Sequence, residues 1–197
     1  MKIFDAWCED PEGKPIHASL RRAVWRNAMN KDPKRTVPIL KKEWFNTKSI
    51  DGKIICLSIL GACDDAELVK TDIIPLNFNE SPPQESVPAA DMHVLGGMLA
   101  ANRVARPLQW EFMKENYDAC IKKLGNPIVV DRFMNLSLSR FTDEKYIDEV
   151  ETFFKDKDTH SFDRTLGTVK DKIRGRAAYK KRDRESLLEW LTANGYA

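Results

Sequence analysis

The chain has 197 residues, of which 42% are hydrophobic and 31% are charged, and its formal net charge at pH 7 is +2. This balance is typical of a folded protein that can bury a core, and it excludes an intrinsically disordered chain. No stretch approaches the ~18 to 20 uninterrupted apolar residues of a transmembrane helix. We therefore expect no membrane contact.

The beginning of the chain and its cysteines predict a cytoplasmic location. Asp5 interrupts the apolar run of residues 1–7, which leaves no hydrophobic region of a secretory leader. The four cysteines are scattered and form no CxxC pair, as is typical of a protein from a reducing compartment. They are Cys8, Cys56, Cys63 and Cys120.

Opposite charges are segregated into blocks along the chain. Residues 21–53 hold ten basic and three acidic side chains, whereas residues 64–91 hold seven acidic side chains and one basic. Residues 141–163 hold eight acidic and three basic side chains, and residues 164–184 hold nine basic and two acidic. We interpret the blocks as neighbouring helices that screen each other's charge on solvated faces.

The last basic block has an alternative interpretation as a surface for RNA or another polyanion. Its candidate contact residues are Lys172, Arg176, Lys180 and Lys181. Tyr179 is the one aromatic residue in residues 164–184, so the block shows no platform for base stacking. We rank a nucleic-acid partner last, because the acidic residues within the block and the acidic helix expected next to it offer local partners.

Apolar spacing in the first half of the chain predicts helices. Leu20, Val24 and Ala28 recur every four residues, which predicts a helix over residues 18–30. A short helix is expected around Ile39, Leu40 and Trp44. Residues 54–60 are apolar on all sides and predict a buried helix that ends near Gly61.

The second half continues the helical pattern. Apolar residues step by three or four from Trp110 to Leu124, and Gly125-Asn126-Pro127 is expected to end that helix. Thr142-Asp143-Glu144 is typical of an N-cap with acids in the first helical turn, and the helix that it begins is expected to bury Ile147, Val150, Phe153 and Phe154. Two further helices are expected, one over residues 166–173 and one over residues 187–191.

The pattern as a whole predicts an all-α protein. No convincing strand alternation is present, and we expect about ten helices joined by short turns within one helical-repeat domain, residues 1–197. Such neighbours form either a bundle or a stacked solenoid. The longest predicted loop is the proline-rich segment 75–88 (PLNFNESPPQESVP), which we interpret as a surface excursion.

Four segments resemble one family in the same order and at matching separations. They are Leu57–Leu68, Gly96–Asp118, Ser137–Phe154 and Asp158–Leu191. The family is the C-terminal domain of the gluzincin zinc aminopeptidases, which include the puromycin-sensitive and alanyl aminopeptidases. The resemblance implies an α/α superhelix of HEAT- or armadillo-like hairpins that covers a catalytic domain, of which this chain is similar to the last part.

The catalytic motifs of that family are missing from this sequence. Zinc peptidase chemistry there needs HExxH on a helix and a downstream Glu, as well as a GxMEN strand. No His in this chain is followed by Glu, and the three His residues stand at least 67 positions apart. We therefore expect no metal site, no cofactor and no autonomous aminopeptidase activity, and we leave open whether the chain is another kind of enzyme.

Three residues are candidates for a ligand-binding groove. His93 shares helical spacing with two glycines that allow close helix contact, so its ring could point into a groove or between helices. Trp110 lies on an apolar stripe and could line either a core or a ligand box. Arg140 stands where the family pattern has a small residue before Phe141.

Three hypotheses of function follow from the sequence. The first is a non-catalytic helical scaffold that binds a peptide, a protein or a small molecule, with an aminopeptidase catalytic domain as one expected partner. The second is a stand-alone enzyme recruited from this scaffold, for example in specialised-metabolite biosynthesis, with a new site in the groove. The third is the basic module for RNA or another polyanion.

Overall fold

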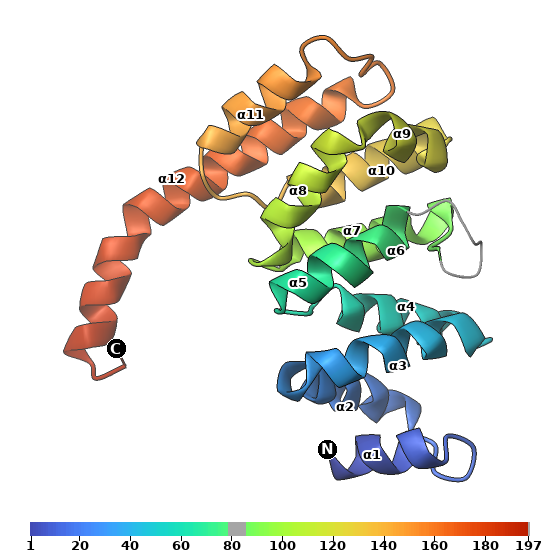
Figure 1. Ribbon diagram of the computed structural model, residues 1–197. Helices are drawn as coiled ribbons and strands as arrows, with labels where there is room; N and C mark the ends of the chain where they lie inside the picture. Colours follow the sequence, from blue (N-terminus) through green and yellow to red (C-terminus); the bar gives the residue numbers. More distant parts are fainter. Residues whose placement is uncertain (79–85, 197) are drawn as a thin grey trace.

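The computed structural model describes residues 1–78 and 86–196 (Figure 1). Every regular element in these two ranges is a helix, and neither range contains a strand. Ten of the α-helices have eight residues or more: α1 (Lys2–Glu9), α2 (Ala18–Lys31), α3 (Pro33–Asn46), α4 (Ile50–Leu60), α7 (Met92–Ala101), α8 (Ala105–Glu115), α9 (Tyr117–Leu124), α10 (Pro127–Leu138), α11 (Lys145–Phe154) and α12 (Asp163–Ala193). Four short elements join α4 to α7: α5 (Ala66–Leu68), the π-helical η1 (Val69–Ile73), α6 (Ile74–Phe78) and the 3-10 turn η3 (Ala89–Asp91). The expected all-α class and the expected number of longer helices are confirmed for the described residues.

The helices stack in chain order to form a superhelix. α3 packs against α2 and α4, α7 packs against α4, α8 and α10, and α12 packs against α10 and α11. Figure 1 shows the layers following one another from α1 at one end to α9 and α10 at the other, with α11 and α12 laid against the last layers. The predicted α/α superhelix of stacked hairpins is therefore confirmed.

One hydrophobic core runs through the stack from Phe4 to Ile173. Trp25, Trp110 and Phe133 are among its largest fully buried side chains. α7 and α10 approach closely because Gly96 has no side chain: a Cβ atom there would lie 2.6 Å from the Phe133 ring. Glycine at this position therefore sets the spacing of two layers.

Short polar side chains begin several of the helices, as the sequence predicts. The carboxylate of Asp65 accepts hydrogen bonds from the backbone N–H groups of Glu67 and Leu68, which satisfies donors that the first helical turn leaves unpaired. His17 starts α2 in the same way, since its ring nitrogen Nδ1 accepts from the backbone N–H of Ser19 at 3.3 Å. At the other end of a helix, Gly125 adopts a left-handed φ of 62° and ends α9.

Three helix predictions need correction. The single helix expected from Trp110 to Leu124 is divided into α8 and α9 at Asn116, whose φ of −121° and ψ of 27° leave the helical region. The two helices expected over residues 166–173 and 187–191 form one continuous helix, α12, because no proline separates them and the single Gly175 between them does not end the helix. The helix expected after Thr142-Asp143-Glu144 begins at Lys145, where the carboxylate of Asp143 accepts the backbone N–H at 3.1 Å.

The proline-rich loop expected over residues 75–88 is shorter than predicted at its beginning. Pro75 and its neighbours belong to α6, because proline is tolerated in the first turn of a helix. Val87 donates a backbone hydrogen bond to the carbonyl of Leu76 at 2.9 Å, which brings the two sides of the segment together. The part of this prediction that covers residues 79–85 lies outside the described residues.

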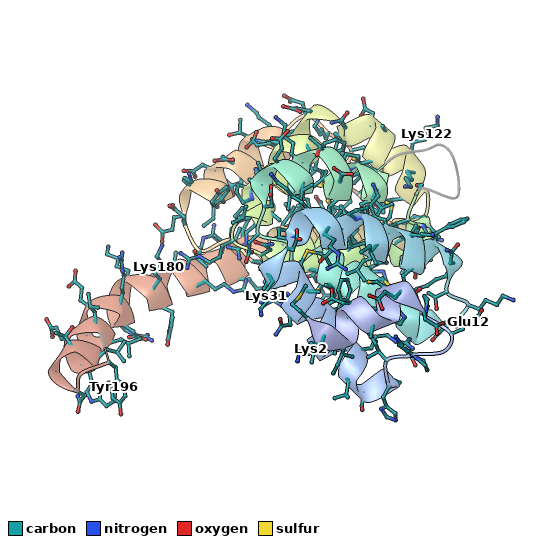
Figure 2. The ribbon with its side chains drawn as sticks, turned by 60° about the horizontal axis from the view of Figure 1, so that its bottom comes forward. Lys2, Glu12, Lys31, Lys122, Lys180 and Tyr196 are labelled. Carbon is teal, nitrogen blue, oxygen red and sulfur yellow. The ribbon has the colours of Figure 1, made fainter. Side chains whose placement is uncertain are left out.

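The last helix extends far beyond the core. α12 has 31 residues, which corresponds to a length of about 46 Å at the usual rise of an α-helix. Its buried residues all lie in its first third, at Thr165, Leu166, Val169 and Ile173. Residues 177–196, called the α12 arm below, project away from the stack (Figures 1 and 2).

Candidate functional site: a basic pocket at the base of the α12 arm

A basic pocket lies where the α12 arm leaves the stack. Its volume is about 490 Å³, and it is open to solvent. The lining residues are Thr142, Lys172, Gly175, Arg176, Tyr179 and Lys180. Thr142 comes from the turn between α10 and α11, and the others come from α12.

The helical repeat explains why three cations share this pocket. Lys172, Arg176 and Lys180 are four residues apart, so they lie above one another on one face of α12. Gly175 leaves open space beside them, because a Cβ atom there would meet nothing within 4 Å. Lys181, which the sequence grouped with these three, is rotated about 100° around the helix and does not line the pocket.

A cluster of arginines surrounds the base of the arm. The pKa of Arg106 is lowered, first by burial of its guanidinium group and then by the positive charges of Arg140, Arg176 and Arg103. The charges of these three arginines therefore act on the guanidinium group of Arg106.

Arg106 is held in a fixed position. Its Nε donates to the carbonyl of Ala100 at 2.6 Å, and its Nη2 donates to the carbonyl of Ala101 at 3.4 Å. The guanidinium carbon lies 6.0 Å from the centre of the Phe141 ring. The two hydrogen bonds satisfy backbone carbonyl groups at the C-terminal end of α7, and the contacts together hold the guanidinium group in one orientation.

Arg176 and Arg140 are different from Arg106, because they lack partners. The Nη1 atom of Arg176 is buried and has no hydrogen-bond partner among the described residues. Within the same residues, the ion pairs of the structure include neither Arg106, Arg140 nor Arg176. The pocket thus presents positive charge that the protein itself leaves unneutralised.

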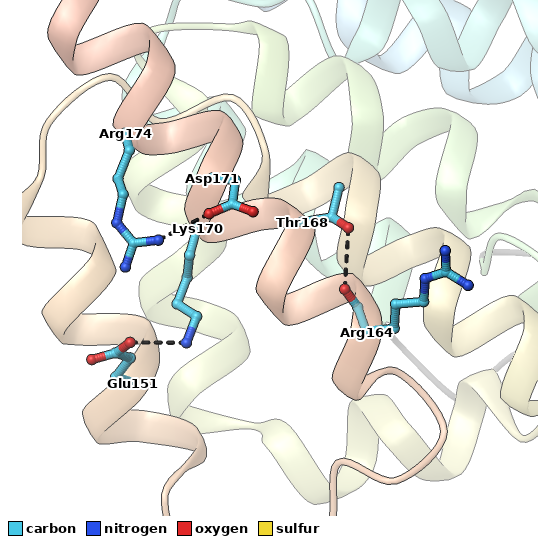
Figure 3. Close-up of polar contacts among 6 residues, drawn as sticks. All are labelled: Glu151, Arg164, Thr168, Lys170, Asp171 and Arg174. Carbon is cyan, nitrogen blue, oxygen red and sulfur yellow. Dashed lines mark hydrogen bonds and ion pairs between the residues drawn. The ribbon is translucent and has the colours of Figure 1, made fainter.

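Other cations of the last basic block do have acidic partners (Figure 3). Lys170 Nζ of α12 lies 2.8 Å from Glu151 Oε1 of α11, and Arg174 Nη1 lies 2.9 Å from Asp171 Oδ1. The expected screening between an acidic and a basic helix is confirmed for Lys170 and Glu151. It does not extend to the pocket.

The structure separates the three residues that the sequence grouped as groove candidates. Trp110 is only 1% exposed, and its Nε1 donates to Glu149 Oε2 at 3.0 Å. Its ring lies at a centroid distance of 5.3 Å from the ring of Phe153, so it is part of the core. His93 lies half-buried on α7, and burial and the charge of Arg132 lower its pKa, which keeps the ring neutral at pH 7. Of the three, Arg140 is the one that belongs to the arginine cluster, since its charge acts on Arg106.

Sequence reasoning missed Arg106 and Thr142. A compositional feature could have indicated Arg106: residues 92–110 contain Arg103 and Arg106 but no Asp or Glu. No acidic residue within this segment screens these two charges, so their screening comes from residues distant in the sequence or from a ligand. Thr142 gave no such indication, because its expected role was the start of a helix.

The buried thiols do not act as nucleophiles in this fold. Burial raises the pKa of Cys56 and of Cys120 to about 12, and it also raises the pKa of Cys63. A thiol must lose its proton before it attacks. These cysteines therefore serve as small core residues.

We expect iodoacetamide to modify Cys8 first in the folded chain at pH 8. Cys8 is partly exposed, whereas the other three cysteines are buried. A thiol with a pKa of about 12 is ionised to roughly one part in ten thousand at pH 8. Mass spectrometry of tryptic peptides should show an adduct on Cys8 before any other cysteine. Equal labelling of Cys56 without denaturant would contradict the buried placement.

The part of the chain that the structure describes contains no group of three or more His, Cys, Asp or Glu side chains arranged to hold a metal ion. None of the helices described has both the length and the apolar character needed to cross a membrane.

The fold defines an all-helical repeat protein. Residues 1–175 match the family model described as "ERAP1-like C-terminal domain". The chain therefore belongs to this family, the C-terminal domain of the M1 aminopeptidases, and the resemblance stated from the sequence is confirmed.

Similar proteins are full-length aminopeptidases. The chain is 26% identical over 184 residues to Aminopeptidase 2 of Candida albicans. The aligned segment makes up 93% of this chain and 19% of that relative. It is 26% identical over 198 residues to the mitochondrial Aminopeptidase 2 of Saccharomyces cerevisiae, covering 100% of this chain and 20% of the relative. Aminopeptidase N of Oryctolagus cuniculus is 24% identical to the chain over 198 residues, which make up 98% of this chain and 20% of that relative. The chain thus spans about one fifth of the length of these relatives.

Proposed function

We propose that this chain is a non-catalytic helical scaffold that packs against the catalytic portion of an aminopeptidase. The family membership supports this role, because the matching segment makes up about a fifth of the relatives and the remaining part offers a partner surface. The scaffold would act as one domain in the cytoplasm. A further supporting observation is the α12 arm.

The α12 arm carries the proposal, because it presents large apolar side chains to solvent. Leu187, Leu188 and Trp190 are 52%, 54% and 56% exposed. The ring of Trp190 stacks on that of Tyr196 at a centroid distance of 5.9 Å, so the aromatic surface is continuous around the end of the helix. Contiguous exposed apolar surface is typical of a protein–protein contact.

The arm also has the charge pattern of an interface. Lys180, Lys181 and Arg184 flank the apolar residues, and all three are exposed. A rim of charge around an apolar centre, with tryptophan at that centre, is the usual arrangement of a protein-binding surface. The alignment with the Saccharomyces cerevisiae aminopeptidase covers 100% of this chain, so the arm has a counterpart in a protein that contains the catalytic portion.

We expect the double substitution Leu187→Lys with Trp190→Lys to weaken binding to that portion by about tenfold or more, because it removes the apolar centre of the contact. The partner for the measurement is the Aminopeptidase 2 of Candida albicans without its matching segment. Size-exclusion chromatography detects the complex, and biolayer interferometry measures its dissociation constant.

Ile128→Lys is the matched control. Ile128 is an exposed apolar residue on α10, outside the arm, and the substitution should leave the dissociation constant unchanged. An equal loss of binding in the control, or no complex with the wild-type chain, would contradict the proposal. So would turnover of an aminoacyl anilide by the isolated chain, or a dimer of the chain that the arm substitutions dissociate.

A further inference from the structure

The structure assigns a second binding site: we propose that the basic pocket binds an oxyanion, either a phosphate or a carboxylate group of a small ligand. The guanidinium group of Arg176 would bind the anion directly, together with Lys172 and Lys180. Arg106, which interacts electrostatically with Arg176, would add a fixed positive charge nearby. The site does not depend on the proposed scaffold role, because an anion can bind in the pocket of the isolated chain.

The first argument is the missing counter-charge. The charges of Arg140 and Arg176 both act on Arg106, and none of the three has an ion pair among the described residues. Elsewhere on the same helix the fold does supply acids, as for Lys170 with Glu151. Positive groups gathered without a carboxylate create a potential that attracts an anion.

The second argument is the buried donor of Arg176. Its Nη1 is shielded from solvent and forms no hydrogen bond. A buried N–H group without an acceptor is costly, and the cost is larger for a charged group. An oxyanion in the pocket would supply the missing acceptor, and the planar fork of a guanidinium group suits carboxylate and phosphate oxygens.

The third argument is the lining of the pocket. Thr142 and Tyr179 bring hydroxyl groups, and Lys172 and Lys180 bring further cations to a space of 490 Å³. Lys172 is already engaged with Asn135 Oδ1 at 3.0 Å, which fixes its position at the edge. A ligand of small-molecule size fits this combination of charge and volume.

Isothermal titration calorimetry at low ionic strength, in a buffer without phosphate, tests the proposal. The probes are inorganic pyrophosphate and citrate. We expect one anion to bind per chain, and we expect Arg176→Gln to weaken binding by ~10-fold or more, because it removes a charge-assisted hydrogen bond. Arg140→Gln should weaken binding less than Arg176→Gln, because Arg140 does not line the pocket and contributes only through its charge. Arg176→Lys keeps the positive charge but loses the planar guanidinium group that donates two parallel hydrogen bonds. The anion affinity of this variant should therefore lie between those of the wild type and Arg176→Gln.

Lys181→Gln is the matched control, since it removes one positive charge from the same helix without touching the pocket. Its affinity should stay within about twofold of wild type, as expected for a solvent-exposed charge. Circular dichroism verifies that each variant is folded. Stronger binding of pyrophosphate indicates a phosphate ligand, and stronger binding of citrate indicates a carboxylate ligand. No binding of either probe, or an equal loss in Lys181→Gln and Arg176→Gln, would overturn the assignment.

Discussion

Trp110→Ala is expected to lower the free energy of unfolding by ~3–5 kcal/mol, the usual cost of removing a large aromatic side chain from a core. The Trp110 ring contacts Phe153 and Phe154, which belong to the next hairpin. Its removal leaves a cavity between two layers and removes the hydrogen bond to Glu149. Chemical denaturation followed by circular dichroism measures the change.

Trp190→Ala provides the comparison within the same chain. Its ring is exposed at the end of the α12 arm, so the substitution should change the free energy of unfolding by no more than ~0.5 kcal/mol. The pair also tests the groove hypothesis for Trp110. If Trp110→Ala left stability unchanged and altered only ligand binding, the ring would belong to a binding surface, contrary to the structure.

Gly96→Ala is expected to destabilise the protein by about 1–2 kcal/mol. A Cβ atom at this position would lie 2.6 Å from Cε2 of Phe133, a fully buried ring that cannot move aside. Overpacking of a core costs ~1–3 kcal/mol, and the better helix propensity of alanine returns only ~1 kcal/mol. The midpoint of urea unfolding should therefore fall.

Gly97→Ala, one position further along α7, should have the opposite sign. Its Cβ atom would lie 3.6 Å from Cβ of Leu136, which is an ordinary contact distance. The gain in helix propensity of up to ~1 kcal/mol should then dominate, and the midpoint should rise. Two substitutions that lowered stability equally would show that α7 and α10 are not packed as described.

Spacing and capping residues predicted most of the helices, because both act locally. Asp65 begins a helix through hydrogen bonds to the next backbone N–H groups, and Gly125 ends one through its left-handed backbone angles. The break at Asn116 was not predictable in this way, since the apolar steps on either side of it keep one helical phase. The continuity of α12 was equally hidden: its second half has no tertiary contact that a periodic pattern could reveal.

The candidate site was predicted only in part, for a physical reason. The i, i+4 spacing of Lys172, Arg176 and Lys180 is visible in the sequence, and it places them on one face of a helix. The approach of Arg106 and Arg140 depends on how α7, α10 and α12 are stacked, which no local pattern contains. The placement of Trp110 shows the same limit, because an apolar stripe looks alike whether it faces a groove or a neighbouring layer.

The order of the helices in the stack also has a consequence for how the chain folds. Because α3 contacts α2 and α4, and α7 contacts α4 and α8, most contacts join segments that are close in sequence. Closing short loops costs little entropy, so such contacts form early and quickly. During synthesis, each hairpin can settle on the one before it as it leaves the ribosome, without waiting for the other end of the chain.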